Sequence, residues 1–230
     1  MSSPSRRLKR LIYREQTLRE NLMGDPNVWG APPSDPEVDA ALAYRVLIHA
    51  EIEQYLEELV SGTLASCDYL YRQYAELRLP GFCAVALHQA ALFTRGDHGA
   101  RTDFRPTEIA KSLPSALADA RQWVERTAIA NNHGLKGSNT VGLLGYIGVD
   151  RGALDPTLLG ALDVLGGERG DAAHLSRREI SRRLHRGSPP GAPRVRRLAS
   201  PSDDVRMVEA VLVLLPGLDK IVSRALKLTI

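Results

Sequence analysis

Aromatic residues and cysteines are scarce in this chain of 230 residues. Aromatics make up 5% of the sequence, and the two cysteines are Cys67 and Cys83. With so few aromatic rings, the core must be built mainly from aliphatic side chains, which suits packed helices better than a β-sandwich. The cysteines lie far apart and near no histidine-rich cluster. We therefore expect free thiols in a reducing compartment, with neither a disulfide framework nor a zinc site.

Long apolar runs are also missing. The nearest approach, Val205–Leu218, is interrupted by Arg206, Glu209 and Pro216, and a membrane-spanning helix needs about 20 apolar residues. Residues 1–10 are polar and basic without an apolar segment, which is unlike a secretory signal. We expect a soluble cytoplasmic protein that has no membrane partner and uses neither a metal nor a cofactor.

Lysine is rare, whereas arginine is abundant. Of the 30 basic residues only five are lysines. Such a bias favours contacts with phosphate or carboxylate groups, but a GC-rich genome produces it as well, and both explanations stay open. The arginines gather between residues 177 and 197, and four of them are candidate RNA-binding residues: Arg177, Arg178, Arg182 and Arg183.

Apolar residues recur at helical spacing along almost the whole chain, and no segment alternates convincingly as a strand does. The sequence therefore predicts an all-α fold. The expected helices cover residues 8–22, 35–62, 63–79, 82–93, 106–129 with a break at 114, 140–147, 155–165 and 205–228 with a kink at 216. Residues 1–36 are expected to form an N-terminal helix and a Pro/Gly loop. Residues 37–230 would be one helical domain with an Arg-rich linker at 186–203 and a C-terminal helix.

The segment Glu168–His174 combines a permanent cation, Arg169, with a titratable imidazole, His174. Arginine can hold a phosphate group in a planar fork, and histidine can move a proton near neutral pH. The spacing alone says little, because Arg126 with His133 and Arg178 with His185 are similarly spaced. The surrounding sequence has to distinguish these pairs.

Three pieces of the chain, taken in order, resemble the HEPN superfamily of helical ribonucleases, particularly its RiboL-PSP-HEPN and MAE-type branch. The first piece is residues 45–56, RVLIHAEIEQYL. The second is residues 131–139, NNHGLKGSN, which lead to Leu143-Leu144 and to residues 147–149. The third is residues 158–165 followed by residues 169–176, RGDAAHLS. Together they span residues 41–176, which is more than half of the chain.

The resemblance implies a HEPN-like helical bundle that cleaves RNA without a metal. In that family the RNA 2′-hydroxyl attacks its own phosphorus, so His174 would transfer the proton and Arg169 would stabilise the charge on the phosphoryl oxygens. Asp171, Asn132, His133 and Glu53 are accessory candidates. The resemblance also implies a homodimer with the active site at its two-fold interface. A role as a toxin or antiviral effector, with an antitoxin or defence protein as partner, comes from the family alone.

The chain departs from the family where many members carry a polar residue directly after the arginine. Here Gly170 takes that place and Asp171 follows. Five residues on a straight helix rotate the chain by about 500°, which leaves Arg169 and His174 about 140° apart. We therefore expect Arg169 to precede the helix that carries His174, with Asp171 near its N-cap. Ser176 also replaces the tyrosine that a modified toxin version of the family would have there.

Two other functions remain open on the sequence. The chain could be a catalytically inactive HEPN-like module that binds RNA or another protein. Alternatively, the Arg-rich stretch alone could bind nucleic acid, which predicts steep salt dependence and no effect of changing His174.

Overall fold

The computed structural model describes most of the chain, as residues 4–24, 34–94, 106–130, 134–174 and 201–230. Within these ranges the side chains of residues 35, 93–94, 106–112, 168–174 and 201–202 are left undescribed. The described residues form α-helices with short π-helical and 3₁₀ segments, and a single isolated bridge between Arg78 and Thr229 is the only extended pairing among them. The predicted all-α class is therefore confirmed. None of the described helices combines the length and apolar character needed to cross a bilayer.

The chain folds as two compact units, and each gathers three separate stretches. Unit 1 comprises residues 1–54, 134–137 and 156–215, and unit 2 comprises residues 55–133, 138–155 and 216–230. The predicted boundary at residue 36 stays a prediction.

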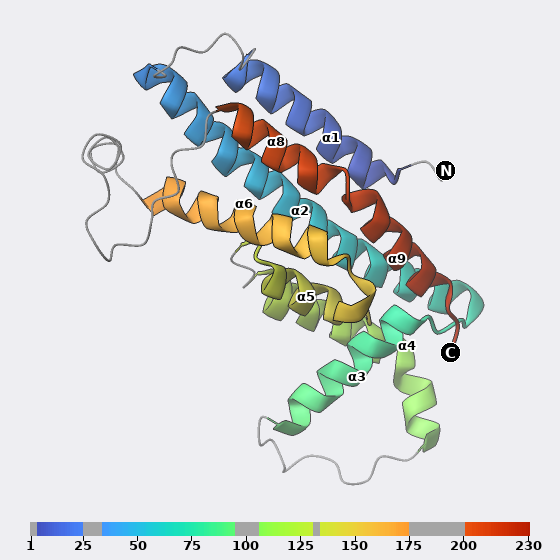
Figure 1. Ribbon diagram of the computed structural model, residues 1–230. Helices are drawn as coiled ribbons and strands as arrows, with labels where there is room; N and C mark the ends of the chain where they lie inside the picture. Colours follow the sequence, from blue (N-terminus) through green and yellow to red (C-terminus); the bar gives the residue numbers. More distant parts are fainter. Residues whose placement is uncertain (1–3, 25–33, 95–105, 131–133, 175–200) are drawn as a thin grey trace. The chain divides into compact units, whose positions relative to one another are not determined.

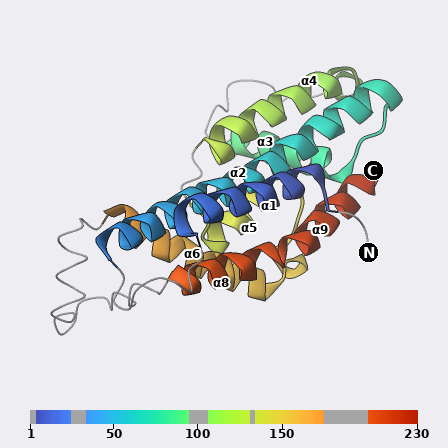
Figure 2. The same ribbon diagram turned by 90° about the horizontal axis from the view of Figure 1, so that it is seen from above.

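Unit 1 is a helical bundle in which α1 (Arg6–Leu18), the first part of α2 (Asp35–Tyr74), α6 (Pro156–His174) and α8 (Pro201–Leu212) run alongside one another (Figures 1 and 2). Ser5 begins α1, because its hydroxyl accepts the Leu8 N–H and satisfies one of the free amides at the helix start. The π-helical turn η1 (Arg19–Met23) extends α1. Aliphatic side chains from all these helices form the buried core, including Leu11, Ile48, Leu162 and Val208.

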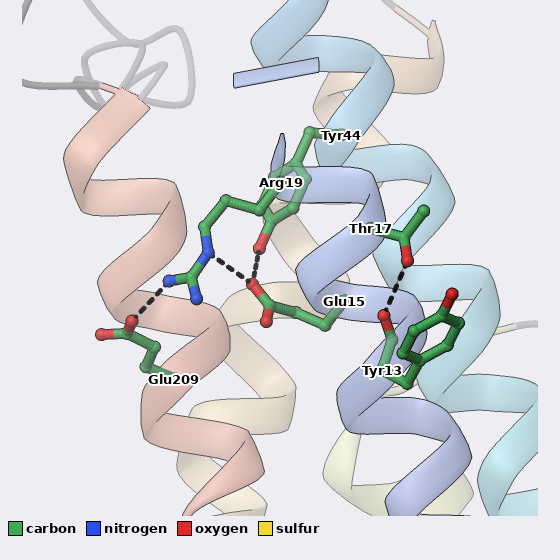
Figure 3. Close-up of polar contacts among 6 residues, drawn as sticks. All are labelled: Tyr13, Glu15, Thr17, Arg19, Tyr44 and Glu209. Atoms are coloured by element: carbon green, nitrogen blue, oxygen red, sulfur yellow. Dashed lines mark hydrogen bonds and ion pairs between the residues drawn. The ribbon is translucent and has the colours of Figure 1, made fainter. Parts of the chain in front are cut away.

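Polar side chains are buried inside unit 1 and join its helices. Arg45 of α2 donates two hydrogen bonds to one carboxylate oxygen of Asp204 in α8, at 3.0 and 2.6 Å, and both residues are at most 3% exposed. In Figure 3, the Tyr44 hydroxyl and the Arg19 guanidinium both reach Glu15, while Arg19 also reaches Glu209 on α8. Burial and the neighbouring Glu15 carboxylate raise the pKa of the Tyr44 hydroxyl far above its usual range, so it stays a donor.

Unit 2 holds the second part of α2 together with α3 (Leu79–Thr94), α4 (Pro106–Val124), α5 (Gly137–Gly145, of which Gly137 belongs to unit 1) and most of α9 (Leu215–Lys227). Short turns continue α4 and precede α6: η3 (Glu125–Ile129) and η4 (Arg151–Ala153). Helices α3 and α4 pack side by side (Figure 2). The Tyr55 hydroxyl donates to Asp219 at 2.7 Å and so joins α2 to α9. Residues 77–79 pair with the last residues of the chain through backbone hydrogen bonds.

The single C-terminal helix predicted over 205–228 is two helices, α8 and α9, which separate at residues 213–214 and not at 216. Three further differences from the predicted helix limits concern glycine and proline positions. No break occurs at Gly62, because the hydroxyls of Thr63 and Ser66 bond to carbonyl oxygens one turn earlier, at 2.6 and 2.8 Å, and so remain satisfied inside the helix. Helix α2 ends instead at Tyr74, after which Ala75 takes a left-handed conformation with φ 55°. The predicted break at Pro114 is also absent, because α4 continues through it to buried Leu117 and Val124.

The third difference concerns the candidate site. Helix α6 was expected to end at Leu165, yet it continues through Gly166, Gly167 and Gly170 to His174. Glycine in a helix costs about 1 kcal/mol relative to alanine. Gly166 lies against the backbone of Leu135 and Lys136, where an added Cβ would be at an ordinary contact distance of 3.4 Å from the Lys136 nitrogen. The packing of residues 134–137 on α6 therefore accompanies the continuation of the helix past Gly166.

Candidate functional site

Arg169, Asp171 and His174 all lie within the last part of α6, whose backbone is described and whose side chains are not. Arg169 is not in a pre-helical position, and Asp171 is not at a helix N-cap. Both expectations were wrong, because the helix begins at Pro156 and runs without interruption. The backbone positions of Arg169 and His174 are therefore about 140° apart around the helix axis.

The segment of residues 134–137 lies between α2 and α6 within unit 1, and we call it the linking segment. On the α2 side, the Gly134 N–H donates to Oε1 of Glu53 at 2.7 Å. The next amide, Leu135 N–H, donates to Nε2 of His49 at 3.4 Å. Two successive backbone amides are thus bound by two side chains that are one helical turn apart.

On the α6 side, the Gly137 N–H donates to Oδ1 of Asp163 at 2.8 Å. The backbones also approach closely here, because a Cβ on Gly137 would lie 3.1 Å from the Leu159 carbonyl oxygen. Gly166, three residues before Arg169, meets the backbone of Leu135 and Lys136. The structure therefore brings together parts of all three sequence pieces that carry the resemblance.

Glu53 is the one accessory candidate whose side chain the structure describes. It is half-buried and binds the linking segment at Gly134, which directly follows His133 in the sequence. Its second oxygen lies 3.7 Å from Nδ1 of His49. The candidates Asn132 and His133 lie outside the described residues, as do Arg177, Arg178, Arg182 and Arg183 and most of the linker 186–203.

Two side chains at this place were not among the predicted site residues: His49 and Asp163. His49 is 1% exposed. A signal for it was present in the sequence, because His49 stands four residues before Glu53 and therefore shares a helix face with it. Asp163 carried no such signal, since it is an exposed acid on α6 and only the fold places it at Gly137.

The site's described groups are hydrogen-bond acceptors directed at backbone amides. Nothing among them forms a cluster of three or more metal-ligating side chains. Comparisons with models of protein families, with curated proteins and with solved structures found no match to this chain.

Proposed function

We propose that this chain is a metal-independent endoribonuclease that acts on cytoplasmic RNA. The observation that supports it is the meeting of α2, the linking segment and α6 within unit 1. These are the three pieces on which the resemblance to HEPN ribonucleases rests. Gly166, one helical turn before Arg169, packs on Leu135 and Lys136, which follow Asn132 and His133 in the sequence.

The proposed reaction is transesterification within the RNA. The ribose 2′-oxygen loses its proton to His174 and bonds to the adjacent phosphorus, while the bond from phosphorus to the 5′-oxygen breaks. The leaving oxygen takes up a proton, and the products are a 2′,3′-cyclic phosphate and a 5′-hydroxyl. Arg169 stabilises the charge on the phosphoryl oxygens. Arg177, Arg178, Arg182 and Arg183 would bind neighbouring phosphates.

The continuous helix favours a site shared between two copies of the chain. On one α6 the backbone positions of the two residues are about 140° apart, which does not favour their meeting at a single phosphate. A site completed across a two-fold axis removes the difficulty, because Arg169 of one copy then acts with His174 of the other. A homodimer with the active site at its interface is therefore part of the proposal.

The first test is a cleavage assay on mixed RNA in excess chelator, with a 2′-deoxy substrate as comparison. Wild type should cut RNA only, and Arg169→Ala and His174→Ala should each slow cleavage by roughly 10²–10⁴-fold. Arg126→Ala is the matched control, because Arg126 is exposed, belongs to a similarly spaced Arg/His pair and bonds Gln122. Cleavage that neither variant alters would refute the assignment.

The second test separates a shared site from a site within one copy. Arg169→Ala and His174→Ala proteins are mixed under conditions that exchange subunits. In a shared site, half of the dimers are mixed and each keeps one intact pair, so about a quarter of wild-type activity should return. No recovery would mean that each copy carries its own complete pair.

An inactive HEPN-like module that binds RNA or a protein is the second candidate. The same continuous α6 favours it, because a helix that separates the arginine and histidine needs no catalytic role for either. It predicts RNA binding without cleavage in the first assay. We also propose a biological role as a toxin or antiviral effector, with an antitoxin or defence protein as partner. This role rests on the family resemblance.

A further inference from the structure

The imidazole of His49 is held in one orientation inside unit 1. Its Nε2 accepts the Leu135 N–H at 3.4 Å, and its Nδ1 lies 3.7 Å from a Glu53 carboxylate oxygen. A backbone N–H is always a donor, so the ring nitrogen facing it must carry no proton. The neutral ring then carries its proton on Nδ1, the nitrogen on the side of the Glu53 carboxylate.

Glu53 uses its two oxygens for two different tasks. Oε1 accepts the Gly134 N–H at 2.7 Å, while Oε2 faces the His49 ring. Gly134 has φ 122°, a conformation that suits glycine, and a Cβ there would lie 3.9 Å from the imidazole. The hydrogen bonds at Gly134 and Leu135 therefore fix the path of the linking segment, and the positive φ of Gly134 fixes its backbone conformation.

The opposite end of the linking segment is fixed to α6. Asp163 accepts the Gly137 N–H at 2.8 Å, and the Gly166 backbone packs on residues 135 and 136. Residues 163, 166 and 170 follow one another on one face of a helix, since they are three and four positions apart. The linking segment thus connects α2 to the α6 face that continues toward residues 170 and 174.

We propose that His49 and Glu53 are positioning residues for the nuclease site. They hold the linking segment on α2, and that segment sets the position of the end of α6 that bears Arg169 and His174. The inference rests on the proposed function for its catalytic consequence. Its structural part, the hydrogen bonds that the Gly134 and Leu135 amides donate to Glu53 and His49, stands on the contacts alone.

Two pairs of variants test the proposal. His49→Leu and Glu53→Ala remove the acceptors, whereas His49→Gln and Glu53→Gln keep an oxygen that can accept the same amide. The control is Glu51→Gln on the same helix, because Glu51 pairs with Arg14 and not with the linking segment. Glu53 is half-buried, so Glu53→Ala remains informative even where His49→Leu does not fold.

The first readout is amide hydrogen exchange at residues 134 and 135, with the ¹⁵N shifts of the His49 ring in wild type. Removing an acceptor should speed exchange at its amide about tenfold, as expected for one lost hydrogen bond. The glutamine variants and Glu51→Gln should stay near wild type. The ring shifts should report a proton on Nδ1. A proton on Nε2, or unchanged exchange in both deletion variants, would overturn the proposal.

The second readout is RNA cleavage by the same proteins. His49→Leu and Glu53→Ala should lower kcat at least tenfold with RNA affinity unchanged, and the glutamine variants should restore it. Deletion variants that exchange faster and cleave at the wild-type rate would refute the positioning role alone. If wild type cleaves no RNA, the proposed function fails, while the exchange results still decide whether His49 and Glu53 hold the segment.

Discussion

The two units of this protein have interiors of different chemistry. Unit 1 buries ionisable side chains, namely Glu15, Arg45, His49 and Asp204. In unit 2 the described buried polar residues are Thr63, Thr140 and one ionisable acid, Asp219, and the remainder of its core is aliphatic or aromatic apart from the Cys67 thiol. Unit 1 also contains Glu53 and the part of α6 that bears Arg169 and His174. The difference indicates where the chain uses directional contacts to fix helices and where apolar packing suffices.

Buried ion pairs rarely stabilise a protein more than apolar side chains of the same shape would, but breaking one is costly. Unit 1 should therefore respond sharply to single polar substitutions. Unit 2 should respond to changes in volume and backbone conformation. The four predictions below test this contrast, from the largest expected effect to the smallest.

Arg45→Ala should destabilise the protein by about 3–5 kcal/mol, because it leaves the Asp204 carboxylate buried without the guanidinium that it binds. Urea unfolding measures the change in free energy. The double variant Arg45→Met with Asp204→Leu should recover most of the loss. As a control, Arg14→Ala removes the partly exposed partner of Glu51, a class of contact worth about 0–1 kcal/mol. A smaller loss for Arg45→Ala than for Arg14→Ala would contradict the contrast.

In unit 2, Gly148→Ala should lower the free energy of unfolding by roughly 1–3 kcal/mol. Gly148 has φ 75°, and a Cβ there would lie 2.7 Å from the Cys83 sulfur atom. Adding Cys83→Ala should recover the part of this free-energy cost that comes from the clash with sulfur. The part that comes from the positive φ should remain. Thermal unfolding of the two variants measures both. If Cys83→Ala brings no recovery, the sulfur contact is not the cause.

Acid should weaken unit 2 through His88. Burial lowers the pKa of this imidazole, against a raising effect of Asp119, and its ring lies 5.3 Å from that of Trp123. The folded state therefore resists protonation, so this stability is present above the unfolded pKa of about 6.5 and is lost as pH falls below it. The urea midpoint should drop less between pH 7.5 and 5.5 in His88→Gln than in wild type. In a Trp29→Phe background, Trp123 fluorescence follows the same transition. An equal drop in both proteins would exclude His88 as the cause.

The smallest effect concerns the thiols. Burial raises the pKa of Cys67 to about 11, and it also raises that of Cys83. Since the thiolate is the nucleophile, both should alkylate slowly with iodoacetamide at pH 8, and the fully buried Cys67 more slowly than Cys83. Mass spectrometry of timed samples gives both rates, and both should rise in denaturant. Faster labelling of Cys67 than of Cys83 in the native protein would contradict the burial.

Helical periodicity was enough to predict the fold class and most helices, because apolar spacing reports which face is buried. It failed at Gly62, Pro114 and Gly166, where the helix continues through a local breaker signal. After Gly62, the Thr63 hydroxyl bonds to the Leu59 carbonyl four residues earlier, which is a local contact. Gly166 packs on the backbone of residues 135 and 136, a tertiary contact that cannot be seen in a local window of sequence.

The candidate site was predictable in part. The sequence predicted Glu53 as an accessory residue, and the structure adds a contact that the sequence did not predict, from the Gly134 N–H. His49 was not among the predicted site residues, although it stands one helical turn before Glu53. The bond between Asp163 and Gly137 joins residues 26 positions apart, so no spacing rule could have supplied it. The roles of Arg169 and His174 stay predictions.

The division of α2 has a practical consequence for anyone who wishes to dissect this protein. Up to Gln54 the helix belongs to one unit and from Tyr55 to the other, and each unit also draws on two later stretches. No single cut of the polypeptide can therefore release either half intact. Truncated fragments should be poorly folded, and protease-nicked protein should stay associated until denaturant is added.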